Sequence, residues 1–182
     1  MPSLPSTPLF IRQQYHTRDG VRRILLVVFH LIKFILVFTV IAAALGTFRT
    51  WQTKHSANQK TFAAGAAPNP LPNGLYRGSV PGHAVSWIGK KFNATDSTGI
   101  NVFDVAGTPT EKYPFKTFIG KGLYDIALDV LVIDYNIPAN PFWLRPVLDE
   151  VAEITPGKYL GKLNLRIIPG YPFTLSYFEL TK

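Results

Sequence analysis

Side chains that could carry out acid–base, metal or nucleophilic chemistry are few in this sequence and stand far apart. The four histidines, His16, His30, His55 and His83, fall in three different regions, and only His83 lies in the C-terminal part of the chain. The absence of cysteine excludes disulfides, thiolate ligands and a cysteine nucleophile. There is no G-x-S-x-G, H-E-x-x-H or phosphate-binding glycine motif. We therefore predict no catalytic residues and no metal site, and an enzyme is the least favoured function.

One pair of carboxylates is close enough in sequence to share chemistry. Asp125 and Asp129 are separated by four residues, which places both on one face of an extended strand. Such a pair can supply a general acid and a general base. The alternation around it predicts instead that both side chains face solvent or a neighbouring subunit.

The C-terminal 110 residues, 73–182, have the spacing of turn residues that is typical of a β protein. Short runs rich in Val, Ile, Tyr and Phe are separated by clusters of Gly, Pro, Asn and Asp. Eight strands suit a small closed antiparallel barrel, although a β-sandwich would give a similar pattern. The predicted strands lie near residues 75–80, 85–92, 100–104, 115–121, 124–134, 147–154, 158–167 and 173–180.

Two runs alternate between apolar and polar residues, as the wall of a barrel should. In residues 124–134, the apolar phase includes Leu128 and Val130, and in residues 158–167 it includes Tyr159 and Leu163. We predict that these four side chains line the barrel interior and would contact an apolar ligand there.

Two short motifs stand at the start of the same region, residues 74–78 (GLYRG) and residues 87–92 (WIGKKF). They resemble the G-x-W-x-G opening, with Tyr76 where tryptophan is usual, and the W-x-G-K-x-F strand of bacterial lipocalin-like domains of the calycin group. The likeness continues through residues 134–138, 145–150, 159–161 and 177–180. The resemblance implies an antiparallel barrel with an internal apolar cavity, commonly used for hydrophobic small molecules.

A proline-rich segment, residues 135–146 (YNIPANPFWLRP), is predicted to be a semi-rigid loop at the barrel mouth. In one interpretation Tyr135 and Trp143 contact a ligand and Arg145 binds its carboxylate or phosphate group. In a second, the aromatic residues and Arg145 sit in a membrane interface. In a third, Trp143 closes the barrel end and Arg145 pairs with Asp149 or Glu150.

Residues 24–45 form a run of 22 residues in which only His30, Lys33 and Thr39 are polar. At 1.5 Å per residue such a helix crosses a hydrocarbon core of about 30 Å. The alternatives are a buried core helix or a cleaved signal peptide, for which residues 42–44 (AAA) resemble a cleavage site. We favour a retained transmembrane helix over residues 24–46.

The charges around this helix predict its orientation. Arginines at positions 12, 18, 22 and 23 precede it, so the positive-inside rule favours a cytoplasmic tail of residues 1–23 and a periplasmic or extracellular C-terminal domain of a plasma-membrane protein. The net charge of +8 is scattered rather than arranged in a basic stripe, which argues against nucleic acid as a partner. Residues 47–72, polar and then rich in Ala, Gly and Pro, are predicted to be a flexible linker.

Lys33 lies too deep in the apolar run to be an ordinary end-of-helix anchor, and leaving it in lipid costs about 2.5–3.5 kcal/mol. His30 is on the same helical face, so both could address another transmembrane subunit, and Ala42 with Gly46 forms a small-x-x-x-small pair that allows close helix approach. The alternatives are a shifted helix that keeps both side chains at the interface, or ligation of a haem or chlorin by His30.

Two functions therefore remain. The first is an accessory or assembly subunit of a larger membrane complex, with a barrel filled by its own side chains; this one explains both the helix and the domain, and we favour it slightly. The second is a membrane-tethered binding protein for an apolar small molecule such as a lipid, quinone or carotenoid pigment, whose signature would be an internal cavity. No cofactor is certain from the sequence.

Overall fold

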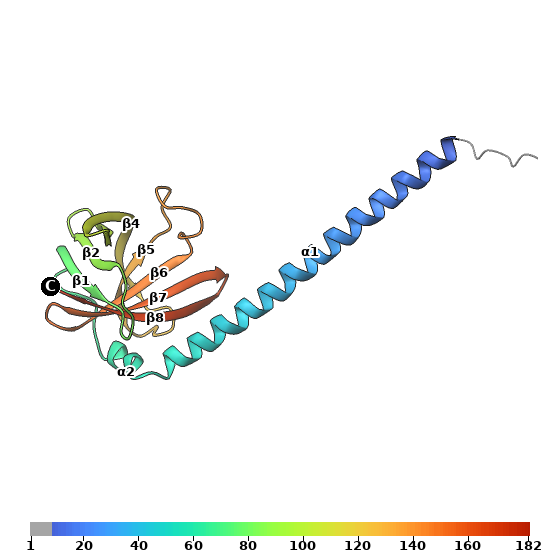
Figure 1. Cartoon of the computed structure of the whole chain (residues 1–182). Helices are drawn as coiled ribbons and strands as arrows, with labels where there is room; N and C mark the ends of the chain where they lie inside the picture. Colours follow the sequence, from blue (N-terminus) through green and yellow to red (C-terminus); the bar gives the residue numbers. More distant parts are fainter. Residues whose placement is uncertain (1–8) are drawn as a thin grey trace, which may run out of the picture. The chain divides into compact units, whose positions relative to one another are not determined.

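The computed structural model describes the backbone of residues 9–182 and the side chains of residues 20–182, and it divides into two compact units, Met1–Leu45 and Gly46–Lys182 (Figure 1). The prolines of the predicted N-terminal tail, at positions 2, 5 and 8, lie outside the described residues.

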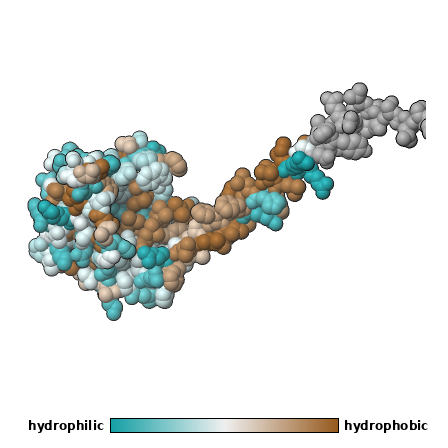
Figure 2. All heavy atoms as spheres, viewed as in Figure 1, coloured by the Kyte–Doolittle hydropathy of each residue, from teal (hydrophilic) through white to brown (hydrophobic). Residues whose placement is uncertain are grey.

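A single helix, α1 (Leu9–Lys54), contains the apolar run. It begins and ends well outside the predicted bounds of 24–46, because no proline occurs between Pro8 and Pro68 to remove a backbone donor. The part Gly20–Lys54 is long and apolar enough to cross a membrane. Figure 2 shows hydrophobic side chains covering much of its visible surface.

Eight antiparallel strands form a closed barrel, which confirms the predicted fold class. Each strand pairs with its neighbour in sequence, and β1 pairs with β8 through Gly78 and Leu180, which closes the barrel and excludes a sandwich. The strands are β1 (Gly74–Ser79), β2 (Trp87–Asn93), β3 (Thr98–Val105), β4 (Thr108–Lys121), β5 (Asp129–Asp134), β6 (Val147–Thr155), β7 (Lys158–Ile168) and β8 (Tyr171–Thr181).

One strand differs from its prediction in a way that matters for the interior. β5 begins at Asp129 rather than at residue 124, because residues 122–128 form a turn in which Leu128 N donates to Asp125 O at 2.8 Å and Gly122 N to Leu128 O at 3.0 Å. Glycine in this segment favours such a turn over an extended strand. The alternation read across residues 124–134 therefore does not describe one strand.

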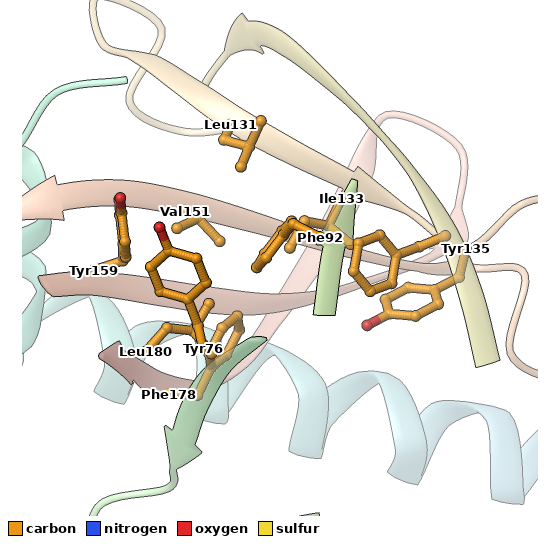
Figure 3. Close-up of a cluster of buried hydrophobic side chains, with 10 residues drawn as sticks. Tyr76, Phe92, Leu131, Ile133, Tyr135, Val151, Tyr159, Phe178 and Leu180 are labelled. Carbon is orange, nitrogen blue, oxygen red and sulfur yellow. The ribbon is translucent and has the colours of Figure 1, made fainter. Parts of the chain in front are cut away.

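Aromatic and branched side chains fill much of the barrel interior (Figure 3). Tyr76 packs edge-to-face against Phe92 and Tyr159, with ring centroids 5.7 and 5.2 Å apart. From β5, Leu131 and Ile133 point into this cluster, since they share one strand face. The buried members are Tyr76, Phe92, Phe115, Leu131, Ile133, Tyr135, Val151, Tyr159, Phe178 and Leu180.

A second buried cluster lies on the outer face of β5–β8, under helix α2 (Ala57–Ala63). The helix starts at an N-cap, where Ser56 Oγ accepts from Gln59 N at 3.3 Å, and it inserts the fully buried Phe62 against the barrel. Beyond α2, Ala66 exchanges two backbone hydrogen bonds with Glu153 of β6. Segment 47–72 is therefore anchored to the barrel through α2 and Ala66, in contrast to the predicted flexible linker. The sequence did not predict this packing, because a seven-residue helix is too short to show a periodic pattern.

Candidate ligand-binding site

A cavity of about 290 Å³ lies inside the barrel, between the aromatic cluster and the loop of residues 135–146. Side chains from β2, β3, β4, β6, β7 and β8 converge on it, and most of them are apolar. This volume is close to the lower end for small-molecule sites in proteins, about 300 Å³. The lining residues are Val80, Val85, Trp87, Lys90, Asn101, Phe103, Tyr113, Tyr135, Leu144, Val147, Asp149, Leu163, Ser176 and Phe178.

Four of these residues form a buried polar group that we call the polar floor: Lys90, Asn101, Tyr135 and Asp149. Lys90 Nζ lies 2.9 Å from Asp149 Oδ2, and the two side chains are 3% and 2% exposed. The same ammonium group donates to Asn101 Oδ1 at 3.0 Å and to the Tyr135 hydroxyl. Trp87 Nε1 also donates to Asn101 Oδ1, at 3.2 Å. A buried ion pair of this kind persists only when further hydrogen bonds satisfy both partners.

A β-bulge completes the hydrogen bonding of Asn101. The register of β3 and β4 shifts between Ile100 and Asn101, which leaves Tyr113 unpaired with a φ of 60°. A bulge of this kind redirects the chain locally, and the Tyr113 carbonyl accepts from Asn101 Nδ2 at 3.0 Å. The Tyr113 ring packs edge-to-face on Phe103 and Trp143 at the cavity wall. Tyr113, with its positive φ, therefore positions its carbonyl group against Asn101 and its ring at the cavity wall.

Two glycines allow β1 and β2 to approach closely beside the polar floor. Gly89 precedes Lys90 and has a φ of 152°, and a Cβ atom there would lie 1.9 Å from the Tyr76 carbonyl oxygen. Gly78 lies under the Trp87 ring, where a Cβ atom would come within 2.4 Å of the ring. Any side chain at either position would displace Trp87 or Lys90 from the cavity.

The electrostatics of the floor favour charged Lys90 and neutral Tyr135. Burial alone would lower the pKa of Lys90, but the charge of Asp149 and the contact with Tyr135 raise it above 10.5 overall. Burial and the charge of Asp149 raise the pKa of Tyr135 to about 12, against the lowering effect of Lys90. At neutral pH the floor therefore holds one positive and one negative charge, and its phenol keeps its proton.

One acceptor on the floor has no partner. Among the described side chains, the buried polar atoms without a hydrogen bond are Asp149 Oδ1 and Asn140 Oδ1. Asp149 lines the cavity, whereas Asn140 lies in the loop and donates to the carbonyls of Pro114 and Tyr135. An unsatisfied buried carboxylate oxygen is costly and requires an explanation.

Tyr135 and Leu163, both predicted from sequence, line the cavity. Tyr159, predicted with them, is also inside the barrel, but it packs on Tyr76 within the aromatic cluster and outside the cavity. Of the four side chains predicted to line the interior, Leu163 therefore lies beside the space that a ligand would occupy, together with Tyr135 from the predicted loop.

Leu128 and Val130 are not inside the barrel. Val130 is fully buried in the outer cluster with Phe62, and Leu128, in the turn before β5, packs against the same cluster. The inward phase of β5 consists of Leu131 and Ile133 instead. The prediction fails because α2 covers the outer face, so both faces of β5 are apolar and alternation does not distinguish them.

The loop residues Trp143 and Arg145 lie beside the cavity without lining it. Trp143 is 55% exposed and packs on Tyr113. Arg145 Nε donates to the Asn140 carbonyl at 3.0 Å and Nη2 to the Pro138 carbonyl at 3.1 Å, so it braces its own loop rather than pairing with a carboxylate of β6. It faces an outer groove of about 640 Å³ that also includes Phe142.

Sequence analysis missed Trp87, Lys90, Asn101 and Asp149 as site residues. Trp87 and Lys90 belong to the WIGKKF run on which the lipocalin-like resemblance rests. Asp149 lies in the inward phase of β6 with Val147 and Val151. A charged residue in an otherwise apolar strand phase is the signal that would have identified it.

A second polar network lies outside the barrel, beneath residues 50–62; we call it the outer network. Lys162, 1% exposed, forms an ion pair with Asp125, which also accepts from Gln59 Nε2 at 2.8 Å. Gln59 Oε1 in turn accepts from the Tyr177 hydroxyl at 2.8 Å. The prediction that both aspartates face solvent is therefore wrong for Asp125, which is held in a structural contact. Asp129 is exposed and pairs with Lys121 at 2.9 Å.

Glu150 extends the outer network along β6, β7 and β8. Its carboxylate accepts from Leu123 N and, at 3.2 Å, from Asn164 Nδ2, and Asn164 Oδ1 accepts from Thr174 Oγ1 at 2.7 Å. Thr174 N donates to Thr50 Oγ1 of α1 at 3.0 Å. Burial raises the pKa of Glu150, with the Leu123 amide and the nearby lysine opposing the rise.

His30 and Lys33 are exposed on α1 and contact residues of their own helix. His30 Nδ1 lies 2.7 Å from the Leu26 carbonyl oxygen, and Lys33 Nζ lies 4.5 Å from the centre of the Phe29 ring. Among the described residues no group of His, Asp and Glu side chains could hold a metal ion. These positions remain candidates for contact with a partner helix.

Gly46 and Ala42 were predicted to allow close approach of a partner helix. Gly46 is buried, and a Cβ atom there would lie 2.7 Å from the Phe173 ring of β8. The close approach at Gly46 is therefore made by the barrel of the same chain. Ala42 lies in α1, in the other unit.

Comparison with known proteins adds information on the fold. No family model matches the chain, and no curated protein matches it. A crystal structure of a protein from Thermomonospora curvata is similar, with a TM-score of 0.50, 17% sequence identity, and coverage of 68% of this chain and 84% of that chain. At this identity the similarity concerns the fold alone. The closed eight-stranded barrel is consistent with a lipocalin-like fold.

Proposed function

We propose that this protein is a membrane-anchored binding protein for a small apolar molecule, which it holds in the barrel cavity. The observation that carries the proposal is the internal space of about 290 Å³, walled mainly by apolar side chains and ending on the polar floor. A barrel serving only as a docking surface has no need for such a space, and its interior would be expected to reach normal packing density. Convergent polar groups at one side of an apolar pocket are typical of ligand sites.

The apolar helix α1 supports the membrane part of the proposal. Its span is long enough for a bilayer. A binding domain on the same chain as an anchor stays near the bilayer, which is the natural reservoir of apolar molecules. We propose that the anchor is retained, with the N-terminus in the cytoplasm and the barrel in the periplasm or outside the cell.

The test uses full-length protein in lipid nanodiscs and a fluorinated naphthalene as probe, followed by ¹⁹F NMR against empty nanodiscs. Leu163→Trp should fill the cavity and weaken binding by at least about tenfold, since it removes most of the space for a ligand. Leu75→Trp places the same side chain on an exposed outer position of β1 and is the matched control. Equal binding by the two variants would contradict an internal site.

The second candidate function, a subunit of a membrane complex, is favoured by the exposed His30 and Lys33 on α1. Lys33→Leu removes the charge from the span and should release any partner subunit that recognises it, while the barrel keeps its probe binding. The measurement is native mass spectrometry of the protein extracted from its own membrane in mild detergent, with Lys60→Leu, at an exposed position of α2 outside the span, as control. An unchanged assembly, or no assembly in the wild type, would count against this function.

A further inference from the structure

The hydrogen-bond donors of the polar floor are all used, and one of its acceptors is not. Lys90 has three ammonium hydrogens and three acceptors, on Asp149, Asn101 and Tyr135. Asn101 Nδ2 donates to the Tyr113 carbonyl and to the Tyr135 hydroxyl, both at 3.0 Å. The Tyr135 hydroxyl lies 3.3 Å from both Asn101 Oδ1 and Asp149 Oδ2. What the floor can still offer is an acceptor, Asp149 Oδ1.

The floor has no net charge to offer a ligand. The positive charge of Lys90 lies 2.9 Å from the negative charge of Asp149 and is matched by it. The guanidinium of Arg145, the nearest candidate for an anion site in the loop, is held by two backbone carbonyls and faces the outer groove. An anionic head group in the cavity would therefore lose its hydration without gaining a free positive side chain as a partner, which is strongly unfavourable.

The remaining lining side chains set the size and polarity of the ligand. Apart from the polar floor and the Trp87 ring nitrogen, Ser176 and Tyr113 supply the other polar groups, two hydroxyls that can rotate to donate or to accept. A cavity of about 150 Å³ holds one benzene ring, so 290 Å³ is suited to one or two rings. The edges and faces of Trp87, Phe103, Tyr113 and Phe178 favour an aromatic or flat ligand.

We propose that the cavity selects a neutral molecule of one or two rings that is apolar except for one hydroxyl or N–H group, and that this group donates a hydrogen bond to Asp149 Oδ1. This inference rests on the proposed binding function and narrows it. It separates phenols, small alcohols and indole-like molecules, which the floor can satisfy, from fatty acids and from hydrocarbons without a donor.

The experiment compares three probes on full-length protein in nanodiscs at pH 7 by ¹⁹F NMR: 6-fluoro-2-naphthol, 2-fluoro-6-methoxynaphthalene and 6-fluoro-2-naphthoate. The first can donate to Asp149, the second keeps the oxygen atom without a donor, and the third is an anion. Empty nanodiscs correct each probe for partition into lipid. We expect the naphthol to bind at least about tenfold more tightly than the other two, as a buried hydrogen bond to a charged group implies.

Asp149→Asn tests the acceptor, because an amide keeps the size of the side chain but no longer presents a carboxylate. The preference for the naphthol should fall to less than about twofold. The double variant Lys90→Met with Asp149→Leu replaces the buried pair by apolar side chains and serves if the single variant does not fold. Asp129→Asn makes the same change at an exposed aspartate and should keep the preference.

Each outcome decides between the two proposals. A naphthol preference that Asp149→Asn removes and Asp129→Asn keeps supports the acceptor site. Equal binding of naphthol and methoxynaphthalene, or tighter binding of the naphthoate, overturns the acceptor site while leaving an apolar cavity that binds ligands. Binding of none of the three probes overturns the proposed function and the acceptor site together.

Discussion

The polar floor and the outer network use the same chemistry for different ends. Each buries a lysine next to an aspartate, Lys90 with Asp149 inside the barrel and Lys162 with Asp125 outside it, and each adds an amide and a tyrosine. Among the described side chains, the outer network leaves no buried polar atom without a partner, whereas the floor leaves Asp149 Oδ1. The outer network is covered by a helix, and the floor borders a cavity.

This difference separates a structural contact from a binding site. A buried ion pair alone indicates neither, because its Coulomb energy is largely offset by desolvation. The informative features are the unused acceptor and the cavity that the same residue, Asp149, lines. In the outer network every buried polar side-chain atom that is described has at least one partner, which fits a role in fixing α2 and the end of α1 to the barrel.

The largest expected effects come from breaking either ion pair. Lys90→Met leaves the buried carboxylate of Asp149 without its counter-charge and should lower the free energy of unfolding by about 3–5 kcal/mol. Lys162→Met should cost less, about 2–3 kcal/mol, because the side chain of its partner Asp125 is 20% exposed. Chemical denaturation of the full-length protein in detergent, followed by circular dichroism of the strands, measures the loss. A loss below about 1 kcal/mol at Lys162 would mean that water, not α2, surrounds this pair.

Double variants then distinguish the two regions. Lys162→Met with Asp125→Leu should regain most of the lost stability and keep the naphthol preference. Lys90→Met with Asp149→Leu should regain stability too, but it should bind naphthol and methoxynaphthalene alike. If the outer double variant loses the preference as well, the two networks are coupled and the outer network also contributes to ligand binding.

Phe62→Ala tests whether α2 is part of the domain. The side chain is fully buried against the outer face, so its removal should cost about 3 kcal/mol or more of stability and expose α2 to proteolysis. Thr61→Ala, at the exposed neighbouring position, should change stability by less than about 0.5 kcal/mol. Probe binding inside the barrel should stay the same in both variants.

The loop offers a smaller contrast between two adjacent residues. Leu144 lines the cavity, whereas Trp143 packs on Tyr113 outside it. Leu144→Ala should weaken naphthol binding by about five- to tenfold through lost contact area, and Trp143→Ala should change it by about twofold or less. The reverse order, measured by the same ¹⁹F titration, would make Trp143 a ligand contact as the sequence predicts.

The smallest effect concerns the proton of Tyr135. Its folded-state pKa of about 12 lies above the ordinary 10.0, so this group contributes stability that is fully present below pH 10 and is lost as the pH rises through 12. The difference between the ultraviolet titrations of the wild type and Tyr135→Phe should have its midpoint near 12. A midpoint near 10 would place the phenol in contact with solvent and open the floor to water.

Much of the fold could be predicted from the sequence, because turn residues and alternation are local signals. All eight strands were located, and β7 shows the predicted inward phase with Tyr159 and Leu163. β5 was less predictable, since α2 makes its outer face apolar as well. The packing of Phe62 could not be predicted, because it depends on a contact between segments far apart in the chain.

The candidate site was predictable only in part, for a similar reason. The proline-rich loop predicts Tyr135 and the alternation in residues 158–167 predicts Leu163 as site residues, and both line the cavity. Lys90 and Asp149 lie on different strands, and only folding shows that the two charges meet at 2.9 Å. Whether Asp149 Oδ1 has a hydrogen-bond partner depends on side chains from several strands, so the pattern within one strand cannot predict it.

The position of α2 in the chain has a consequence for the order of folding. Both α2 and the end of α1 precede every strand, yet they pack on β5–β8, and β1 pairs with β8, the last strand to be synthesised. Contacts of such high sequence separation slow folding. Most of the surface that Phe62 covers belongs to β5, β6 and β7, so Lys162 and Glu150 remain hydrated until these strands have formed. Helix docking is thus expected to follow the formation of β7, and barrel closure to follow the formation of β8.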